Sequence, residues 1–326
     1  MNLLTNSRLR VFRDCQRMHR LRYIEGWRPV KESEALRFGS LYHVGLEAWW
    51  TAIKDERDPL EAAWLAIRGR AVNPYEQAKV DELIAGYDRK WRGDAARYKV
   101  IGAELTFECP LLNPETMRPS TTWRLAGKID ALVTDRETGA VLVMEHKTST
   151  EGFDDPAGAY WARLAMDSQI SAYVIGAESL GYQVQETLYD VALRPGLRPK
   201  EATPLEARKF TKDGRLYATQ REVAETPDEY RTRIRESIEG EPDRYFARRS
   251  IPRMASQMRE FMEDAWVMAT MMRESERRGF APRNPDACNR FGQCAFWGVC
   301  STGSSCADFP TDYIQSAEKN PELVEV

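Results

Sequence analysis

Residues 127–147 read GKIDALVTDRETGAVLVMEHK. Two apolar runs rich in β-branched residues, 128–134 and 140–145, flank the polar segment 135–139, which contains a glycine. Alternating apolar runs on either side of a short polar segment with glycine are typical of a β-hairpin. The stretch therefore predicts two neighbouring antiparallel strands at the centre of the fold.

The predicted hairpin register brings charged side chains together. If Asp135 pairs with Ala140 across the turn, Asp130 lies directly opposite Glu145. Lys147 follows Glu145 by two residues, and strand side chains alternate between faces, so Lys147 shares the face of Glu145. The hairpin therefore predicts two carboxylates and one amine inside a wall of valine, leucine and isoleucine.

Apolar surroundings make such charges costly unless they satisfy one another or a bound cation. Two carboxylates, which offer only oxygen ligands, suit Mg²⁺ or Mn²⁺. The simpler alternative is a structural salt bridge among Asp130, Glu145 and Lys147 on a solvated sheet face, because ion pairs of that kind also occur in strands. The hairpin alone leaves both interpretations open.

Length and composition limit the protein class. The chain has 326 residues, of which 42% are hydrophobic and 30% charged, which is typical of a globular, soluble protein. It contains no run long and apolar enough to span a bilayer, and its first residues lack a signal-peptide pattern, so we expect a cytoplasmic protein. In that compartment the six cysteines are expected to bind metal or be buried, rather than form disulfides.

Charge is distributed unevenly, although the formal net charge is only −3. Residues 1–31 carry eight arginines and lysines against two acidic residues, whereas residues 307–326 carry five acidic residues against one lysine. A basic segment on a nearly neutral protein is compatible with a nucleic-acid partner, here through Arg10, Arg13 and Arg17. Taken alone the signal is weak, because a charged helix face is usually only solvated.

Periodicity and capping residues predict an alternation of helices and strands. Helices are expected at 7–24, 34–53, 59–67, 74–97, 160–180, 227–239 and 256–278. Strands are expected at 100–111, 123–134, 140–147, 182–193 and 245–253. The segment 194–226, rich in proline, lysine and arginine, is expected to be an insertion or mobile loop.

Four cysteines lie near the C-terminal end with five residues between neighbours: Cys288, Cys294, Cys300 and Cys306. Thiolates suit Zn²⁺ or an iron–sulfur cluster. Structural zinc sites usually space paired ligands by about two to four residues, so the wider spacing favours a cluster. Cys15 is a fifth candidate ligand, while Cys109, in a predicted strand, is expected in the core.

The order of these features resembles the RecB-like branch of the PD-(D/E)XK nuclease superfamily, in particular its iron–sulfur members, which include AddB-type and CRISPR-associated exonucleases and phage relatives. The resemblance covers nearly the whole chain. The matching positions are Cys15, His43, Gly127 and Asp130 of a G-x-x-D segment, Glu145 and Lys147 of an E-x-K-T segment, Gln169 and Tyr173 of a Q-x-x-x-Y helix, and the cysteines at 288, 294 and 300. Close cysteine pairs, common in these relatives, are absent here, and Cys306 is an extra candidate.

The resemblance implies a restriction-endonuclease-like α/β core, a central mixed sheet flanked by helices, and metal-dependent hydrolysis of DNA. His43, Asp130, Glu145 and the backbone carbonyl of His146 would hold Mg²⁺ or Mn²⁺, with Glu104 as an outer or second-metal carboxylate. Further implied roles are orientation or deprotonation of water by Lys147, positioning by Gln169 and Tyr173, and phosphate binding by Arg10, Arg13, Arg17 and Arg248. A structural 4Fe-4S cluster would use Cys15, Cys288, Cys294 and Cys300.

The expected organisation is one composite domain over residues 1–326. It would comprise a helical part (1–98), a nuclease core (99–194), a loop and helical part (195–280), a cysteine region (281–306) and an acidic tail (307–326). The expected function is a DNA exonuclease in DNA processing or recombination, with any protein partner unknown and no membrane involved. The alternatives are a non-catalytic iron–sulfur protein that binds DNA, and a nuclease stabilised by Zn²⁺.

Overall fold

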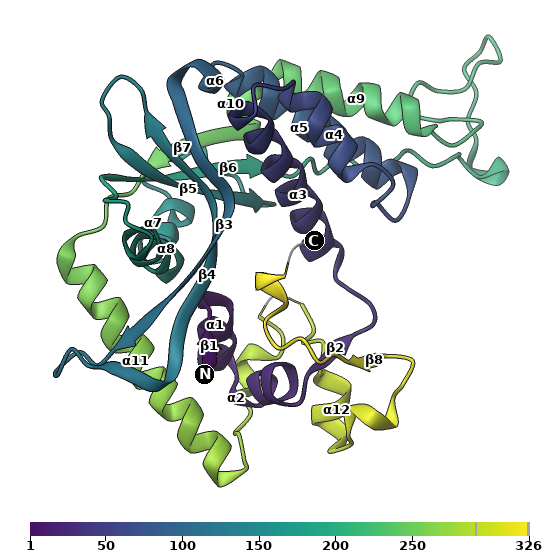
Figure 1. Ribbon diagram of the computed structural model, residues 1–326. Coiled ribbons are helices and arrows are strands. Elements are labelled where there is room, and N and C mark those ends of the chain that lie inside the picture. Colours follow the sequence, from purple (N-terminus) through teal and green to yellow (C-terminus); the bar gives the residue numbers. More distant parts are fainter. Residues whose placement is uncertain (291, 325–326) are drawn as a thin grey trace.

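The predicted hairpin forms the centre of a six-stranded sheet in the computed structural model, which describes residues 1–290 and 292–324. Strands follow the order β1–β4–β5–β6–β7, and β3 also pairs with β4. The β3–β4, β4–β5 and β6–β7 pairs are antiparallel, whereas β1–β4 and β5–β6 are parallel. The strands are β1 (Asn2–Leu4), β3 (Tyr98–Leu112), β4 (Pro119–Asp135), β5 (Val141–Ser149), β6 (Glu186–Leu193) and β7 (Phe246–Ser250). With helices on both faces, this confirms the predicted mixed α/β fold (Figure 1).

The register of the central hairpin is the predicted one. Ala131 pairs with Met144, Thr134 pairs with Val141, and the Asp135 amide donates to the Ala140 carbonyl at 2.9 Å. Along β3, most residues of β4 also pair in an antiparallel ladder. Both faces of β4 and β5 are therefore largely buried, which explains why their sequences are nearly continuous apolar runs.

Helices fill the space on either side of the sheet. α3 and α5 cover one face and α7 and α8 cover the other (Figure 1). The helices are α1 (Asn6–Asp14), α2 (Gln16–His19), α3 (Glu34–Lys54), α4 (Pro59–Ile67), α5 (Pro74–Trp91), α6 (Asp94–Arg97), α7 (Ala159–Ala165), α8 (Ser168–Ser179), α9 (Pro227–Gly240), α10 (Pro242–Tyr245), α11 (Ala255–Arg278) and α12 (Trp297–Thr302). None of the described helices is long and apolar enough to cross a membrane.

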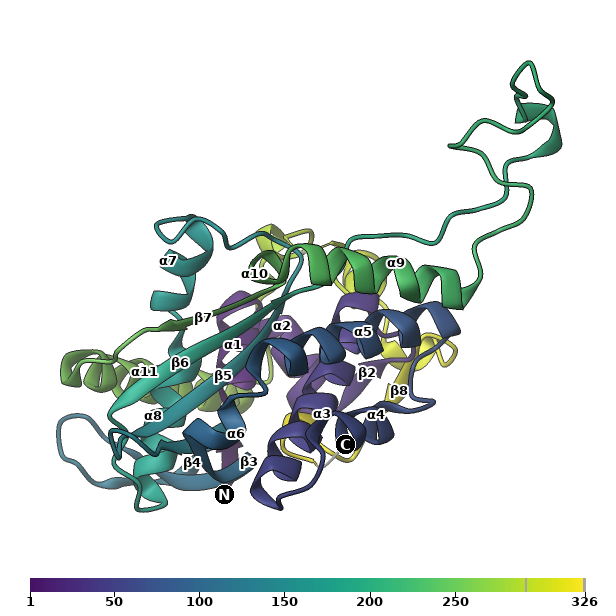
Figure 2. The ribbon, with the colours of Figure 1, turned by 90° about the horizontal axis from the view of Figure 1, so that it is seen from above.

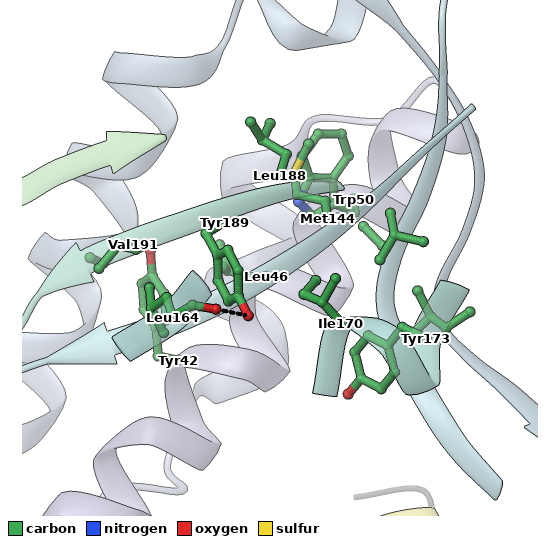
Figure 3. Close-up of a cluster of buried hydrophobic side chains, with 14 of the residues drawn as sticks. Tyr42, Leu46, Trp50, Met144, Leu164, Ile170, Tyr173, Leu188, Tyr189 and Val191 are labelled. Atoms are coloured by element: carbon green, nitrogen blue, oxygen red, sulfur yellow. Dashed lines mark hydrogen bonds between the residues drawn. The ribbon is translucent and has the colours of Figure 1, made fainter. Parts of the chain in front are cut away.

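The core joins these helices to the sheet. Figure 3 shows Trp50 of α3 and Ile170 of α8 packed about Met144 of β5 and Leu188 of β6. Burying a large apolar side chain stabilises the fold by about 1.5–3 kcal/mol. Tyr189 of β6 adds a directed contact, because its hydroxyl donates to the Leu164 carbonyl at 3.2 Å.

Glycines in β4 and α8 permit close packing. A Cβ on Gly127 would lie 2.7 Å from the ring of Phe107, and a Cβ on Gly176 would lie 2.4 Å from the same ring. Phe107 of β3 thus fills a space that two glycines leave open. The glycine of the G-x-x-D segment has a packing reason in this chain, since a larger residue would push α8 away from the sheet.

Three predicted helices are interrupted. The helix expected at 7–24 breaks at Cys15, whose backbone is extended (φ −159°, ψ 114°), and it continues as α2 and a π-helix over Arg20–Ile24. The helix expected at 160–180 breaks before Asp167, whose side chain caps α8 by accepting from the Gln169 amide. The helix expected at 74–97 divides into α5 and α6 at Gly93. In the first two cases tertiary contacts override the local periodicity.

The two ends of the chain meet. β2 (Trp27–Pro29) pairs with β8 (Tyr313–Gln315) in a separate two-stranded sheet, and the Arg17 amide donates to the Pro282 carbonyl at 3.0 Å. Between β6 and α9, residues 194–226 have almost no regular structure and extend away from the rest of the protein (Figure 2). The irregular conformation agrees with the predicted loop, while its being an insertion stays a prediction.

Candidate functional site

The two hairpin carboxylates lie one step beyond the last described β4–β5 pair, where the strands begin to separate. Asp130 is 5% exposed and Glu145 is 1% exposed. The amide of His146 donates to Asp130 Oδ2 at 2.8 Å, which fixes the Asp130 carboxyl against β5. Glu145 Oε2 has no hydrogen-bond donor within the described part of the chain. The register therefore places both carboxyls where the sequence predicted.

A second group of donors faces Asp130 from α3 and β3. His43 Nδ1 lies 3.7 Å from Asp130 Oδ2 and 3.9 Å from Glu104 Oε1. One donor atom from each of the three residues lies within 4.8 Å of the other two, a spacing that could hold one cation. From the sequence resemblance, Glu104 is expected in an outer or second-metal role. Its direct approach depends on the β3–β4 ladder and on a left-handed backbone at Glu104 (φ 46°), neither of which its neighbours in sequence indicate.

Lys147 joins this hairpin to α8. Its Nζ lies 2.6 Å from Glu145 Oε1 and 3.7 Å from Asp167 Oδ2, and it donates to Gln169 Oε1 at 2.7 Å. The Gln169 amide in turn donates to the Tyr173 hydroxyl at 2.8 Å. The predicted Lys147, Gln169 and Tyr173 are thus brought together. Asp167 was not predicted, although it precedes a helix in the manner of a capping residue.

Burial shifts the pKa values of the two hairpin carboxyls strongly. It raises the pKa of Asp130 to about 8, with the Glu104 carboxylate adding to the shift, and it raises the pKa of Glu145 to about 8, with Asp130 adding. Burial also acts on Glu104, but hydrogen bonds from His43 and Lys128 bring its pKa below the ordinary value. Lys128 Nζ lies 2.9 Å from Glu104 Oε2.

The raised pKa values show that the site lacks positive charge. Four carboxyls (Glu104, Asp130, Glu145 and Asp167) share two lysines, so the two most buried acids are disfavoured as anions. A divalent cation beside Asp130 and Glu145 would supply the missing positive charge. Oxygen donors with one imidazole suit Mg²⁺ or Mn²⁺. The residues present therefore fit a divalent metal.

The ring of His146 points away from Asp130 and Glu145, whereas its backbone amide donates to Asp130. The ring is buried, and its Nδ1 lies 3.3 Å from Asp190 Oδ2 on the opposite face of β5. Trp50 stacks on the ring with centroids 6.2 Å apart. Because side chains alternate along the strand, Glu145 and Lys147 face the site, whereas the ring of His146 lies on the opposite face of the sheet.

The predicted phosphate-binding arginines divide into two groups. Arg10 and Arg13 are exposed, whereas the Arg17 Nε donates to the Ala281 carbonyl at 2.9 Å. The Arg248 side chain is 9% exposed, pairs with Asp94 and Asp190, and lies over the ring of Trp91 at 4.0 Å. The expectation that Arg248 binds phosphate does not fit this position, because its guanidinium is already engaged inside the protein.

The cysteines gather at the junction of the chain ends. Burial raises the pKa of the Cys300 thiol; the positive charge of Arg17 opposes the shift, and Cys294, Cys15 and Cys288 add to it. The break at Cys15 turns this thiol toward the C-terminal segment, where it accepts from the Asn284 amide at 3.5 Å. Within the described residues, no three cysteine sulfurs lie within 4.8 Å of one another.

Cys306 lies beside this group, since Cys294 and Cys300 pack against the same small apolar cluster and Cys300 also acts on its thiol. It is 1% exposed and packs with Leu21, Phe296, Val299 and Tyr313 in a small apolar cluster. Burial raises the pKa of its thiol to about 11, with Glu25 adding to the shift. Cys109 is buried in the main core, as predicted.

Comparison with protein families agrees with this geometry. Residues 4–301 match the family model described as the PD-(D/E)XK nuclease superfamily. A search of the curated proteins found no relative that matches. The family match spans the N-terminal helices, the hairpin with Asp130, Glu145 and Lys147, and the cysteine region through Cys300. The chain therefore belongs to the PD-(D/E)XK nuclease superfamily.

Proposed function

We propose that this protein is a Mg²⁺- or Mn²⁺-dependent DNA nuclease, and more specifically an exonuclease that acts in DNA processing or recombination. The observation that carries the proposal is the pair of buried carboxyls, Asp130 and Glu145, whose pKa values are raised to about 8 although Lys147 lies 2.6 Å from Glu145. A buried acid pair short of positive charge is the chemistry of a metal site rather than of a structural salt bridge.

The proposed metal ligands are His43, Asp130, Glu145 and the backbone carbonyl of His146. Glu104 joins them, because one of its oxygens lies in the same donor group as His43 and Asp130. A bound divalent ion would polarise the phosphodiester and lower the pKa of the attacking water. The donors come from α3, β3, β4 and β5, so the sheet and one helix hold the site without any loop residue.

Lys147 is proposed to act as a cation rather than as a base. Burial favours its neutral form, but Glu145 and Asp167 outweigh that effect and raise the pKa of Lys147 above its ordinary value. A charged Lys147 can orient the attacking water and offset negative charge that develops on the phosphoryl oxygens. Gln169 and Tyr173 then position Lys147 and limit its rotamers.

The phosphate-binding surface is proposed to include Arg10, Arg13 and Arg17. Arg10 and Arg13 have no acidic partner among the described residues, and α1 lies beside α8 because Ser168 Oγ donates to Asn6 Oδ1 at 2.9 Å. The N-terminal arginines therefore flank the helix that holds Gln169. Phosphate contacts of this kind position a strand without reading its sequence.

The cysteine group is proposed to hold a structural 4Fe-4S cluster through Cys15, Cys288, Cys294 and Cys300, with Zn²⁺ as the alternative. A closed zinc site with Zn–S bonds of about 2.3 Å holds its sulfurs roughly 3.8 Å apart. Five residues separate neighbouring cysteines along the sequence, which is wider than the usual spacing of paired zinc ligands and favours a cluster, in which several metals and sulfides stand between the cysteines. Protein purified without oxygen should be brown, and Cys15→Ala should lose the colour whereas Cys306→Ala should keep it. A colourless protein with stoichiometric zinc would contradict the cluster.

The experiment that tests the nuclease is digestion of end-labelled linear DNA and covalently closed circular DNA with Mg²⁺, Mn²⁺ or EDTA. We expect metal-dependent release of labelled mononucleotides or short oligonucleotides from linear DNA and no cleavage of the circle. Cleavage of the circular DNA would show that the protein is an endonuclease rather than an exonuclease. An absence of cleavage on both substrates with both metals would contradict the nuclease itself.

A further inference from the structure

The segment between β6 and α9 has almost no regular secondary structure, but it is held together by its own hydrogen bonds. Its two limbs are joined by backbone hydrogen bonds, from the Thr203 amide to the Arg221 carbonyl at 2.8 Å and from the Thr211 amide to the Arg215 carbonyl at 2.7 Å. A bridge between Phe210 and Leu216 closes its tip. We call residues 195–226 the arm. Figure 2 shows that it projects well clear of α9 and of the sheet.

The base of the arm is fixed to the body. Glu225 is 3% exposed, its carboxylate accepts from Arg233 at 2.7 and 2.8 Å, and it also accepts from the Lys200 amide at 2.8 Å. The Glu225 carbonyl accepts from Tyr75 and the Leu197 carbonyl accepts from Tyr230. A buried carboxylate with both oxygens engaged by the body and by the arm fixes the base of the arm.

The tip carries the features of a single-strand binding surface. Phe210 and Tyr217 are 54% and 48% exposed. The exposed Lys209 and Lys212 have no acidic partner among the described residues. Residues 208–217 hold four basic residues and one acidic residue, in a chain whose net charge is −3. Exposed aromatic rings between unpaired lysines suit stacked bases and phosphates of an unpaired strand.

The arm starts just after the end of β6, beside the end of β5 that carries Lys147 of the proposed active site. The Arg194 amide donates to the Ser149 carbonyl at 2.7 Å, directly after the strand residues that follow Lys147. Sixteen residues lead from the start of the arm at Pro195 to Phe210 at its tip. A fully extended segment of that length reaches at most about 50 Å. A strand that leaves the site can therefore reach the tip several nucleotides away.

We propose that the arm is a second DNA-binding element, which holds single-stranded DNA outside the active site through Lys209, Lys212, Phe210 and Tyr217. The proposal rests on DNA being the substrate, and it adds a strand preference and a second contact region to that function. Charge decides against a protein partner, because a polyanion complements the unpaired lysines and its bases complement the aromatic rings.

The test compares binding of short and long single-stranded oligonucleotides with Ca²⁺ in place of Mg²⁺, by fluorescence anisotropy over a range of salt. Oligonucleotides of about 10 nucleotides match one binding unit, while about 40 should reach the arm as well. Lys209→Ala with Lys212→Ala, and separately Phe210→Ala with Tyr217→Ala, should each weaken binding of the long strand about tenfold. Binding of the short strand and of blunt duplex should not change.

A matched control removes two basic side chains elsewhere. Lys99→Ala with Arg136→Ala takes the same charge from exposed positions at the hairpin-turn end of the sheet, away from the arm. Only the lysine pair of the arm should reduce the salt slope for the long strand, by about 1.4, since each phosphate contact on a single strand contributes about 0.7.

Two outcomes would overturn the proposed DNA-binding role of the arm. One is wild-type affinity of both arm variants for the long strand, which would leave the exposed surface to a protein partner. The other is an equal loss for short and long strands, which would indicate a disturbed body rather than a lost contact. Neither outcome bears on cleavage, because binding is measured without turnover and the proposed site residues are unchanged.

Discussion

Buried carboxyl groups lie on both faces of the sheet at β5, yet the two faces differ in how the negative charge of those groups is balanced. On one face, Asp130 and Glu145 have pKa values raised to about 8. On the other, Asp190 is equally buried, but its pKa is lowered, because Arg248 and His146 outweigh the effect of burial. Its Oδ2 accepts from Arg248 at 3.0 Å and from Tyr87 at 2.6 Å.

The difference shows that burial alone does not identify a metal site. Among the described residues, each face also leaves one carboxylate oxygen without a donor, Glu145 Oε2 and Asp190 Oδ1, so an unpaired oxygen does not distinguish the faces either. The number of neighbouring cationic side chains distinguishes the two faces. Asp190 has a buried guanidinium of its own, whereas the acids around Asp130 outnumber their lysines. The unbalanced face is the one that requires a ligand.

The largest expected effect is on catalysis. Glu145→Gln and Asp130→Asn should each lower the rate of DNA cleavage about a thousandfold or more, because each removes a proposed metal ligand. The metal-free stability of both variants should equal or exceed that of the wild type, since a neutral amide replaces a disfavoured anion. Cleavage rates and urea denaturation in EDTA check the two parts.

The same variants distinguish a metal site from a structural salt bridge. If Asp130, Glu145 and Lys147 only formed an ion-pair network, losing one acid would destabilise the protein and leave its other functions intact. Wild-type cleavage by either variant would show that the active site lies elsewhere.

The next effect concerns the balanced face. Asp190→Asn leaves the buried Arg248 with Asp94 alone, and breaking a buried pair in this way costs about 3–5 kcal/mol of unfolding free energy. Chemical denaturation in EDTA measures it, with Asp130→Asn as the matched change on the other face. Equal losses for both variants would remove the distinction between the faces.

The hairpin was predictable because its register follows from local chemistry. A glycine-containing turn and two apolar runs fix which residues face each other, and alternation then places Asp130, Glu145 and Lys147. The helices predicted at 34–53 and 59–67 likewise begin where expected, because Ser33 and Asp58 cap the first turns of α3 and α4. In each case the deciding contact lies within a few residues along the chain.

Features set by contacts between distant segments were not predictable. Glu104 reaches the donor group through the β3–β4 ladder, and Arg248 is buried by carboxylates from α6 and β6. The break at Cys15 depends on a C-terminal segment about 270 residues away, so helical periodicity could not reveal it. These positions require the tertiary fold before their roles can be judged.

A smaller effect is expected at Lys147. Lys147→Met should lower the cleavage rate about a hundredfold, because a positive charge near the reacting phosphate is lost. Metal binding should persist, since the proposed ligands remain. Mn²⁺ titration followed by calorimetry, beside cleavage rates, separates the two properties. Loss of metal binding equal to that of Glu145→Gln would make Lys147 part of the metal-holding structure instead.

The smallest effect is the pH dependence of metal-free stability. The pKa values of Asp130 and Glu145 are raised in the folded protein, so the folded state holds more protons than the unfolded state between about pH 4 and 8. Their contribution to stability is complete below that window and is lost as pH rises toward 8. Between pH 7 and 8 the wild type in EDTA should lose about 2 kcal/mol more than Asp130→Asn with Glu145→Gln. Asp190 contributes no slope there, because its lowered pKa lies below the window.

Melting temperatures at several pH values test the difference. Mg²⁺ should also stabilise the wild type more at pH 8 than at pH 6, since it competes with protons for the same oxygens. Parallel melting curves for wild type and variant across this range would mean that the two carboxyls are already ionised without metal, and the contrast between the faces of β5 would then disappear.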